Sequence, residues 1–375
     1  MQKIAAIPPM VRLHAGDAAF LFGQRRRAFR EHRLGEVGLG RLDQRLDANI
    51  AGLLAAGQIG WDLAAEQAAE VVGAGEMFAL AALALATGEN VGQAIALAMP
   101  STAGRKGLSG ALAWSRPAEL KPFLAGWQGA GDPGLRLLGM MALGHHGHDP
   151  GKPLVDGLAD ADPALRARAA KLAFEFGRLD MVAPLRALQE DPAAGFWARM
   201  ALLRFGERAE IANQDLADPD LAGLALDHMF CARPDLAREV LSALLKRPDV
   251  SVLALSRAGV ARDRSILPWL VQQMEDPALA EAAGFAVLDL VPLNLTDCGL
   301  FTETPDSLGP AFADLDPAPL PIAAKLADWL AAGAEVGVPF VSLRRMMLDG
   351  LRRGAQNPAQ PLARWRHRRN MAAWL

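Results

Sequence analysis

Apolar residues recur at helical spacing along most of this chain, and between residues 132 and 288 a short phrase divides them into units. Each unit begins with Asp-Pro, or once with Arg-Pro, directly before an apolar run. The prolines of these phrases are Pro133, Pro163, Pro192, Pro219, Pro248 and Pro277. Successive prolines are therefore 30, 29, 27, 29 and 29 residues apart. A nearly fixed period in this range is typical of stacked helical repeats.

The phrase itself predicts where a helix starts. An Asp side chain accepts hydrogen bonds from the unpaired N–H groups of the first helical turn, and Pro at the first helical position loses no needed donor. The residue six positions after each proline is always small. These small residues are Gly139, Ala169, Ala198, Ala225, Ala254 and Ala283. Apolar residues four positions before and after them share the same helix face, so the spacing predicts a close contact with a neighbouring helix.

Glycines near the expected ends of these helices predict left-handed C-caps. The four positions are Gly144, Gly177, Gly206 and Gly259. A second apolar run follows in most units, for example at 153–158 and 182–188. Each unit is therefore predicted to be a pair of helices, and runs with the period of two that strands require are scarce.

The phrase Asp-Pro-x-Leu-Arg at 132–136 and 162–166, together with the period, resembles the short bacterial form of HEAT repeats. The resemblance covers residues 132–288 and, more loosely, residues 75–131. It implies a right-handed stack whose second helices line a concave face. An irregular helical bundle is the alternative, and the regular proline spacing disfavours it.

The predicted fold is all-α: a HEAT-like α-solenoid of stacked antiparallel helix pairs with helical caps at both ends. Residues 1–74 are expected to form the N-terminal helical cap and residues 75–291 the repeat solenoid. Residues 292–320 are acidic and rich in proline, which predicts a long loop. Residues 321–375 are expected to form a C-terminal cap that closes the open end of the stack, with helices at 323–332, 342–353 and 361–374.

A second resemblance lies in the N-terminal segment. The phrase Leu-Asp-Gln-Arg-Leu-Asp-Ala at 42–48, followed by Gly52-Leu53 and Gly60-Trp61, is similar to the signature of an uncharacterised proteobacterial HEAT-repeat family. Leu320-Pro321 and Trp329 fit that family's C-terminal segment, whereas the ending at 365–369 matches it less well. The family consists of conserved hypothetical proteins whose genes often lie near type VI secretion genes. Membership implies an accessory role in a secretion system.

Composition and charge narrow the classes of function. The formal net charge is −3, so the molecule as a whole offers no field for a polyanion, and nucleic acid is not the expected partner. Cys231 and Cys298 give neither a disulfide framework nor zinc-ligand spacing, which indicates a cytoplasmic protein. The first thirty residues lack a signal-peptide pattern, and the longest apolar run, residues 77–86, is too short to cross a membrane.

One cluster has the residue types of a metal site. His145, His146, His148 and Asp149 fall within five residues, and imidazole and carboxylate groups are common metal ligands. The cluster lies at an expected interhelical turn, however, and no second group of ligands has a matching spacing elsewhere. No metal is therefore predicted.

Two arginine clusters, at 25–33 and 364–369, are candidates for contacts with phosphate groups. The first is diluted by acidic residues, and the surrounding chain is neutral to acidic. The alternative is that both clusters lie on solvated helix faces.

The expected function is noncatalytic binding. The sequence lacks a phosphate-cradling Gly loop, a Gly-x-Ser-x-Gly elbow, a His-Glu-x-x-His motif and paired cysteines, so no catalytic residue and no cofactor are predicted. A solenoid offers a long ridged surface with few deep pockets, which suits a scaffold or adaptor that holds a protein or peptide partner. The expected contact face lies on the second helices and is lined by Lys121, Trp127, Arg186, Arg238, Lys246, Trp269 and Gln272.

Two other functions remain open. One is a HEAT-like enzyme, such as an alkylated-base DNA glycosylase or a bilin lyase. A glycosylase needs a basic groove for duplex phosphates, and the acidic overall balance argues against it. The other is an inhibitor or immunity-type binding protein, which the sequence does not separate from a scaffold.

Overall fold

Helices account for nearly all of the regular secondary structure. The computed structural model describes residues 6–295, 297–333 and 339–362. Over these residues the all-α prediction is confirmed. The only strands in the described ranges are β1 (Phe301–Thr302) and β2 (Leu320–Pro321), which pair antiparallel.

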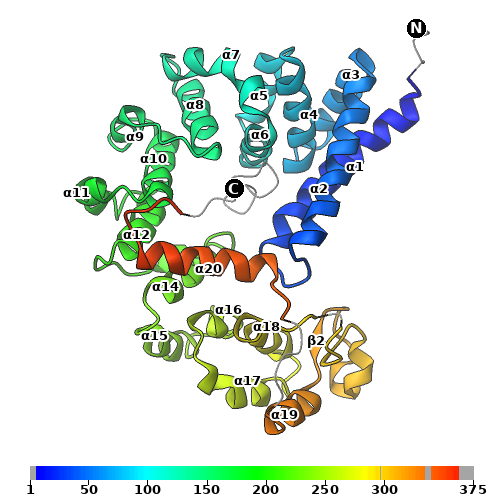
Figure 1. The fold of residues 1–375 in the computed structure, drawn as a ribbon, viewed down its shortest axis with the longest axis vertical. Coiled ribbons are helices and arrows are strands. Elements are labelled where there is room, and N and C mark those ends of the chain that lie inside the picture. The colour runs from blue at the N-terminus through cyan, green and yellow to red at the C-terminus, as the bar shows by residue number, and fades with distance from the viewer. Residues whose placement is uncertain (1–5, 296, 334–338, 363–375) are drawn as a thin grey trace.

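Between residues 74 and 290 the helices form two rows along one curved path (Figure 1). The inner row consists of α4 (Ala74–Thr87), α6 (Thr102–Trp114), α8 (Pro133–His145), α10 (Pro163–Phe176), α12 (Gly195–Arg204), α14 (Ala222–Ala232), α16 (Ser251–Arg257) and α18 (Ala280–Leu290). The outer row consists of α5 (Val91–Ala98), α7 (Pro117–Gln128), α9 (Lys152–Gly157), α11 (Val182–Ala187), α13 (Asn213–Ala217), α15 (Ala237–Leu244) and α17 (Leu267–Gln273). Short 3-10 turns are η1 (Leu179–Met181), η2 (Ala258–Ala261) and η3 (Arg264–Ile266). Each inner helix packs against the next inner helix, and the chain alternates between the rows.

The Asp-Pro phrases lie at the starts of the inner helices. The Asp132 carboxylate accepts a hydrogen bond from the backbone N–H of Leu135 at 2.9 Å, and α8 begins at the adjoining proline. Helix α10 begins in the same way. The four later helices begin three residues after the proline. In these units a tight turn comes first, as where Leu221 N donates to Asp218 O at 3.0 Å.

The small residues of the inner helices lie where the two rows come closest. Ala169 is fully buried, and a Cβ added to Gly157 of α9 would lie 3.1 Å from its Cβ. A Cβ added to Gly139 would lie equally close, 3.1 Å from Gln128 of α7. The predicted small residues therefore lie at the contact between paired helices.

Two of the four predicted glycine caps are correct. Gly177 and Gly206 have φ values of +68° and +78°, in the left-handed region. Gly144 and Gly259 do not have positive φ, so that prediction is wrong for them. A Cβ at Gly144 would lie 2.5 Å from a leucine of α10, and one at Gly259 would lie 2.0 Å from a backbone oxygen of α18. Close helix packing, and not a left-handed backbone, accounts for both glycines: Gly259 faces backbone, whereas Gly144 faces the end of a leucine side chain.

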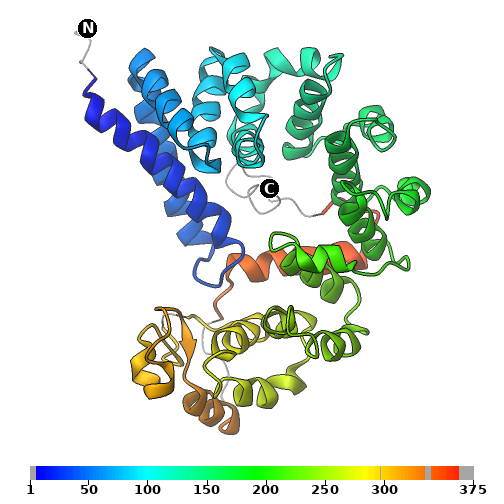
Figure 2. The same ribbon diagram turned by 180° about the vertical axis from the view of Figure 1, so that it is seen from behind.

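The N-terminal helices close the curved path into a ring. Helix α1 (Pro8–Ala28) packs against α2 (Glu36–Ala55), α3 (Gln58–Glu70) and α4. Figures 1 and 2 show the lower end of α1 and α2 next to the last part of the chain. There Leu343 N donates to Leu34 O at 2.8 Å, and Arg33 Nη1 lies 3.0 Å from Glu303 Oε1. The segment between α1 and α2 is therefore in contact with the C-terminal part of the described chain.

The segment predicted as an acidic loop, residues 292–320, folds against the end of the inner row. It contains β1, η4 (Pro305–Leu308) and η5 (Pro310–Phe312). Phe312 and Leu320 are buried together with Ala280 of α18. Helix α19 (Ala323–Ala331) then packs on α17, at the end of the outer row.

Helix α20 (Leu343–Gln356) does not cover the end of the stack, where a terminal cap is expected. It lies across the inside of the ring against α12 and α14 (Figure 1). Arg204 Nε of α12 donates to Gly354 O at 3.2 Å, and Leu362 N donates to Glu175 O of α10 at 2.8 Å. The last expected helix, at 361–374, lies almost entirely outside the described residues.

Candidate functional site: a cationic cavity inside the ring

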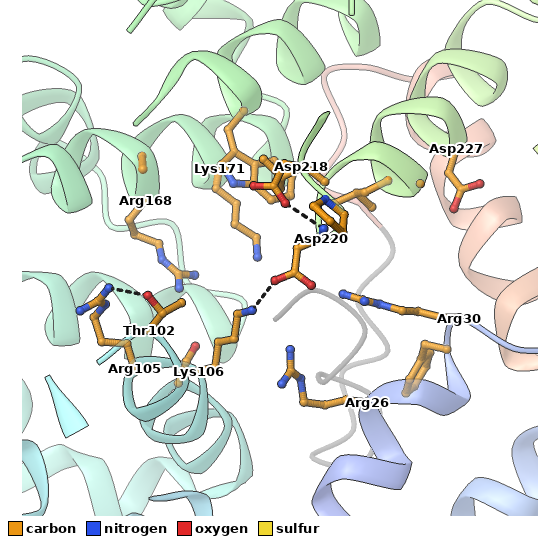
Figure 3. A pocket seen from close by; sticks show the side chains of 18 of the residues that line it. Arg26, Arg30, Thr102, Arg105, Lys106, Arg168, Lys171, Asp218, Asp220 and Asp227 are labelled. Carbon is orange, nitrogen blue, oxygen red and sulfur yellow. Dashed lines mark hydrogen bonds and ion pairs between the residues drawn. The ribbon is translucent and has the colours of Figure 1, made fainter. Parts of the chain in front are cut away.

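The inside of the ring contains a cavity of about 520 Å³ (Figure 3). Its walls come from α1, α6, α8, α10, α12, α14, α16 and α20, and the turn at 218–221 projects into it. The first helices of the repeats thus supply most of the wall. Side chains that are more than three hundred positions apart in the sequence, such as Arg26 and Met347, meet in this space because the ring is closed.

Positive side chains predominate around the cavity. The cations are Arg26, Arg30, Arg105, Lys106, Arg168, Lys171, Arg257 and Arg344. The carboxylates are Asp218, Asp220 and Asp227. Eight cations against three carboxylates leave a formal excess of five positive charges, whereas the whole chain carries −3. The argument from total charge against an anionic partner therefore does not hold inside the ring.

Asp227 compensates the cations at one end of the cavity. Its two oxygens accept hydrogen bonds from Arg344 at 2.9 Å each, and Arg257 Nε lies 3.5 Å away. The Arg257 and Arg344 guanidiniums also lie over the ring of Phe285, at 5.0 and 4.8 Å from its centroid. At this end of the cavity the two guanidiniums are therefore held by a carboxylate and an aromatic ring.

Asp220 lies among the cations at the other end. Its Oδ2 is 2.6 Å from Lys106 Nζ, and Figure 3 shows its carboxylate directed toward Lys106, with Arg26 and Arg30 beyond. The hydrogen bond and charge of Lys106, together with the charges of Arg30 and Arg26, hold the pKa of Asp220 below its usual range.

Arg26 lies in the last turn of α1, and Arg30 lies two residues beyond the end of that helix. Neither guanidinium forms an ion pair with a carboxylate of the described residues. Burial, and then the neighbouring charge of Arg30, lower the pKa of Arg26, while Asp220 acts in the opposite direction. Two like charges held this close favour the approach of an anion.

The rest of the wall is apolar. Leu137, Met141, Leu224, Leu253 and Met347 line the cavity between the charged groups. Trp197 of α12 also lines it, and the ammonium of the nearby α10 lysine lies 4.8 Å from the centre of one of its rings. The cavity can therefore hold a ligand that carries both anionic and apolar groups.

A buried charge network adjoins the cavity where the ring closes. Arg344 of α20 donates to Asp289 of α18 at 2.7 to 3.2 Å as well as to Asp227 of α14. Asp289 Oδ1 lies 3.0 Å from His32 Nε2, and His32 Nδ1 lies 3.0 Å from Ser342 Oγ. All five side chains are buried. The network joins α14, α18 and α20 to the segment that follows α1.

Within this network each charge is matched. Burial raises the pKa of Asp289, but the charge of Arg344 and the hydrogen bond from His32 more than offset it and hold that pKa well below its usual range. Burial lowers the pKa of Arg344, but Asp227 and Asp289 more than offset it and raise that pKa above its ordinary value. Burial lowers the pKa of His32, which favours its neutral form.

Ser342, His32 and Asp289 have the hydrogen-bond order of a hydrolase triad, but not its accessibility. Ser342 is 1% exposed, does not line the cavity, and its Oγ accepts from Arg345 N as the cap of α20. At the cavity wall, Ser109 Oγ lies 2.9 Å from His145 Nε2, and these side chains are only 4% and 9% exposed. Both serine–histidine contacts are therefore part of the packed interior.

The histidine cluster at 145–149 does not converge on one point. His145 bonds to the serine of α6 described above, whereas His146 Nε2 donates to Leu112 O at 3.0 Å. Asp149 pairs with Arg178 at 3.1 Å. In the ranges that the structure describes, no group of three or more His, Cys, Asp and Glu residues is placed to hold a metal ion.

The seven residues predicted to contact a partner lie on or directly after outer-row helices. These residues are Lys121, Trp127, Arg186, Arg238, Lys246, Trp269 and Gln272. The outer row holds the second helices, so their expected placement on the concave face is wrong: the first helices line it (Figure 1). None of the seven lines the cavity, and a role for them in binding stays a prediction.

Three of the seven already have partners within the chain. Arg186 and Arg238 form exposed ion pairs with Glu207 and Asp263. Trp127 is 6% exposed and stacks on a phenylalanine of its own helix.

The arginine cluster at 25–33 divides into groups with different surroundings. Arg25 is buried and its Nε lies 2.7 Å from Asp43 Oδ1, whereas Arg33 forms the exposed pair with Glu303. Only Arg26 and Arg30 line the cavity. Their spacing of four residues indicates a shared helix face, which is the signal that could have separated them from their neighbours. The cluster at 364–369 lies outside the described residues.

What the fold and the site define is an all-α protein with a cationic cavity enclosed by its inner helices. No family model, no curated protein and no solved structure matches the chain. Among the residues that the structure describes, no helix is both long and apolar enough to cross a membrane. The cavity is therefore the feature of the molecule that bears on function.

Proposed function

We propose that this protein is a noncatalytic binding scaffold of the HEAT-like α-solenoid type, which holds an acidic segment of a partner protein in the cavity. The observation that carries the proposal is the excess of five positive charges inside the ring of a chain whose net charge is −3. A concentration of one charge sign in a concave site attracts ligands of the opposite sign and speeds their association.

Binding fits the cavity better than catalysis does. The groups that line it are mainly cations and apolar side chains, with three carboxylates, and the two serine–histidine contacts near it are buried. Burial raises the pKa of the Cys231 thiol to about 12, so this cysteine has little thiolate at neutral pH. An activated nucleophile is thus missing from the described part of the wall, and this leaves the HEAT-like enzymes as the weaker alternative.

An acidic peptide fits better than a nucleic acid. A duplex needs an extended track of cations along its two backbones, whereas this cavity is about 520 Å³ and carries three carboxylates among its cations. The apolar wall suits aliphatic or aromatic side chains that lie between acidic ones. The resemblance to the secretion-associated family suggests, as part of the proposal, that the partner belongs to such a system.

The test is titration of a fluorescent peptide in which glutamate and leucine alternate. We expect the double variant R26Q/R30Q to weaken binding by about tenfold to thirtyfold, since each lost charge contributes on the order of 1 kcal/mol at 4 Å in water. Binding by the wild type should weaken as salt is raised.

The matched control is the double variant R27Q/R33Q. It removes the same charge from the same region, but neither arginine lines the cavity. Equal losses for the two double variants would show that only the long-range charge matters and would overturn the proposal. Tighter binding of a DNA duplex than of the peptide would favour the glycosylase-type alternative instead.

A further inference from the structure

The repeat pattern does not account for the acidic side chain of Asp220 in the cavity. Asp220 follows the proline of the fourth phrase, and its carboxylate reaches Lys106 of α6, 114 positions earlier, at 2.6 Å. Figure 3 shows this carboxylate between Lys106 on one side and Arg30 on the other, and the charge of Arg26 also acts on it. Asp220 therefore occupies the place where an anionic group of a ligand would be most attracted.

The repeat pattern supports this reading of Asp220. The residue after the phrase proline is small in four of the six units, at Gly134, Ala164, Ala193 and Ala278. It is acidic at Asp220 and Asp249. Asp249 pairs with the arginine of its own phrase at 2.7 Å on the outer surface. Only Asp220 crosses the ring to a cation of another unit.

The carboxylate of Asp220 is not needed to start its helix. Asp218 serves that turn, since its side chain accepts from Asp220 N at 2.8 Å and its backbone oxygen accepts from Leu221 N at 3.0 Å. The ion pair with Lys106 is also partly solvated, with the two side chains 60% and 35% exposed. Exposed pairs of this kind contribute little to stability, so the carboxylate can be displaced without unfolding the turn.

We infer that Asp220 is a resident counter-ion in an oxyanion subsite formed by Arg26, Arg30 and Lys106. A carboxylate of the acidic partner segment displaces it and takes over the contact with Lys106. The inference rests on the proposed function and adds an autoinhibitory contact to it. Asp220 lowers the affinity for any single anion, and a partner must supply several contacts at once to bind.

The experiment measures binding of two probes, the glutamate–leucine peptide and inorganic pyrophosphate, to the wild type and to D220N. Removal of one negative charge close to the bound anion should tighten the binding of both probes by about fivefold in water. The matched control is D249N, which changes the equivalent residue of the next unit outside the cavity and should leave affinity unchanged. K106M/D220N should lose part of the gain, because the freed lysine is one of the groups that bind the anion.

The outcomes separate the inference from the proposed function. If the wild type binds the peptide and D220N binds it equally or more weakly, Asp220 contributes to binding or is neutral, and the inference is wrong. If D220N binds pyrophosphate more tightly but no variant binds the peptide, the resident counter-ion stands and the peptide scaffold fails. If neither probe binds the wild type or D220N, both are overturned. Melting curves of all variants show whether a lost signal reflects unfolding.

Discussion

The same types of charged side chain occur at the junction where the ring closes, around Arg344, and at the open end of the cavity, which contains Arg26 and Arg30. Their surroundings differ between the two regions. At the junction, Arg344, Asp227, Asp289 and His32 are all buried; Arg344 pairs with both aspartates, and His32 lies within hydrogen-bond distance of Asp289. At the open end, Arg26 and Arg30 are partly solvated and lack carboxylate partners among the described residues. The comparison indicates that charge balance, and not the presence of arginine, distinguishes arginines that stabilise the fold from arginines that we propose to bind a ligand.

The most severe test removes one charge from the junction. We expect D289N to lower the free energy of unfolding by roughly 3–5 kcal/mol, because it leaves Arg344 buried with one carboxylate where it had two. Urea unfolding at neutral pH measures the change. The comparison variant E207Q breaks the exposed pair with Arg186 and should cost less than about 1 kcal/mol. Similar losses for D289N and E207Q would remove the distinction between the two regions.

A packing variant tests the frame that holds both regions in place. Ala169 is fully buried on α10 opposite Gly157 of α9. Replacement by leucine should overpack the contact between the rows and cost roughly 1–3 kcal/mol. The exposed Ala183 of α11 is the control, where leucine should change the melting temperature little. An unchanged melting temperature for A169L would contradict the close contact between the rows.

A pH series extends the comparison to His228, a buried side chain that forms no ion pair in the described part of the chain. Burial lowers the pKa of His228 to about 4, and its Nδ1 donates to Leu224 O at 2.7 Å. The unfolded chain binds this proton near pH 6.5 and the folded chain only near pH 4. Stability from this group is therefore complete above pH 6.5 and falls as pH drops toward 4, at up to about 1.4 kcal/mol per pH unit.

The variant H228Q should flatten that part of the pH dependence. Urea unfolding of H228Q and the wild type at several pH values from 7 to 4.5 gives the two slopes. H14Q, at a half-buried position on α1, controls for loss of a histidine as such. Parallel slopes for H228Q and the wild type would assign the acid sensitivity to other groups.

The smallest expected effect lies at the open end of the cavity. R26Q/R30Q should leave the free energy of unfolding within about 0.5 kcal/mol of the wild type, because two like charges are removed and no ion pair is broken. The same protein should bind the acidic peptide much more weakly. A loss of stability as large as that of D289N would make these arginines structural.

Much of the fold could be predicted because its signals are local. The Asp caps depend on residues within one turn of each other, as at Asp132 and Asp162, and the starts of α8 and α10 follow from them. The small residues of each first helix likewise predict a close neighbour. They do not predict which neighbour. Position near a helix end likewise does not distinguish a glycine cap from a glycine at a helix contact, as Gly144 and Gly259 show.

The site could not be predicted because it depends on which row faces inward. Both helices of a pair carry apolar faces, and the direction of curvature comes from the packing of all units together. The resemblance to HEAT repeats implies that the second helices lie inside, and the seven predicted contact residues belong to those helices or follow them directly. The cavity instead combines Arg26, Lys106, Arg168 and Arg344, which only ring closure brings together. The net charge of −3 likewise does not indicate a cationic cavity.

The position of α20 has a consequence for how the chain folds. His32 and Ser342, which meet at the junction, are separated by 310 positions in the sequence. The helix pairs form from residues close in the chain, so they can assemble as the ribosome releases them, while the entropy of closing so long a loop delays the final contact. Helix α20 is therefore expected to dock after the helix pairs have formed, and the wall of the cavity is complete only once it has docked.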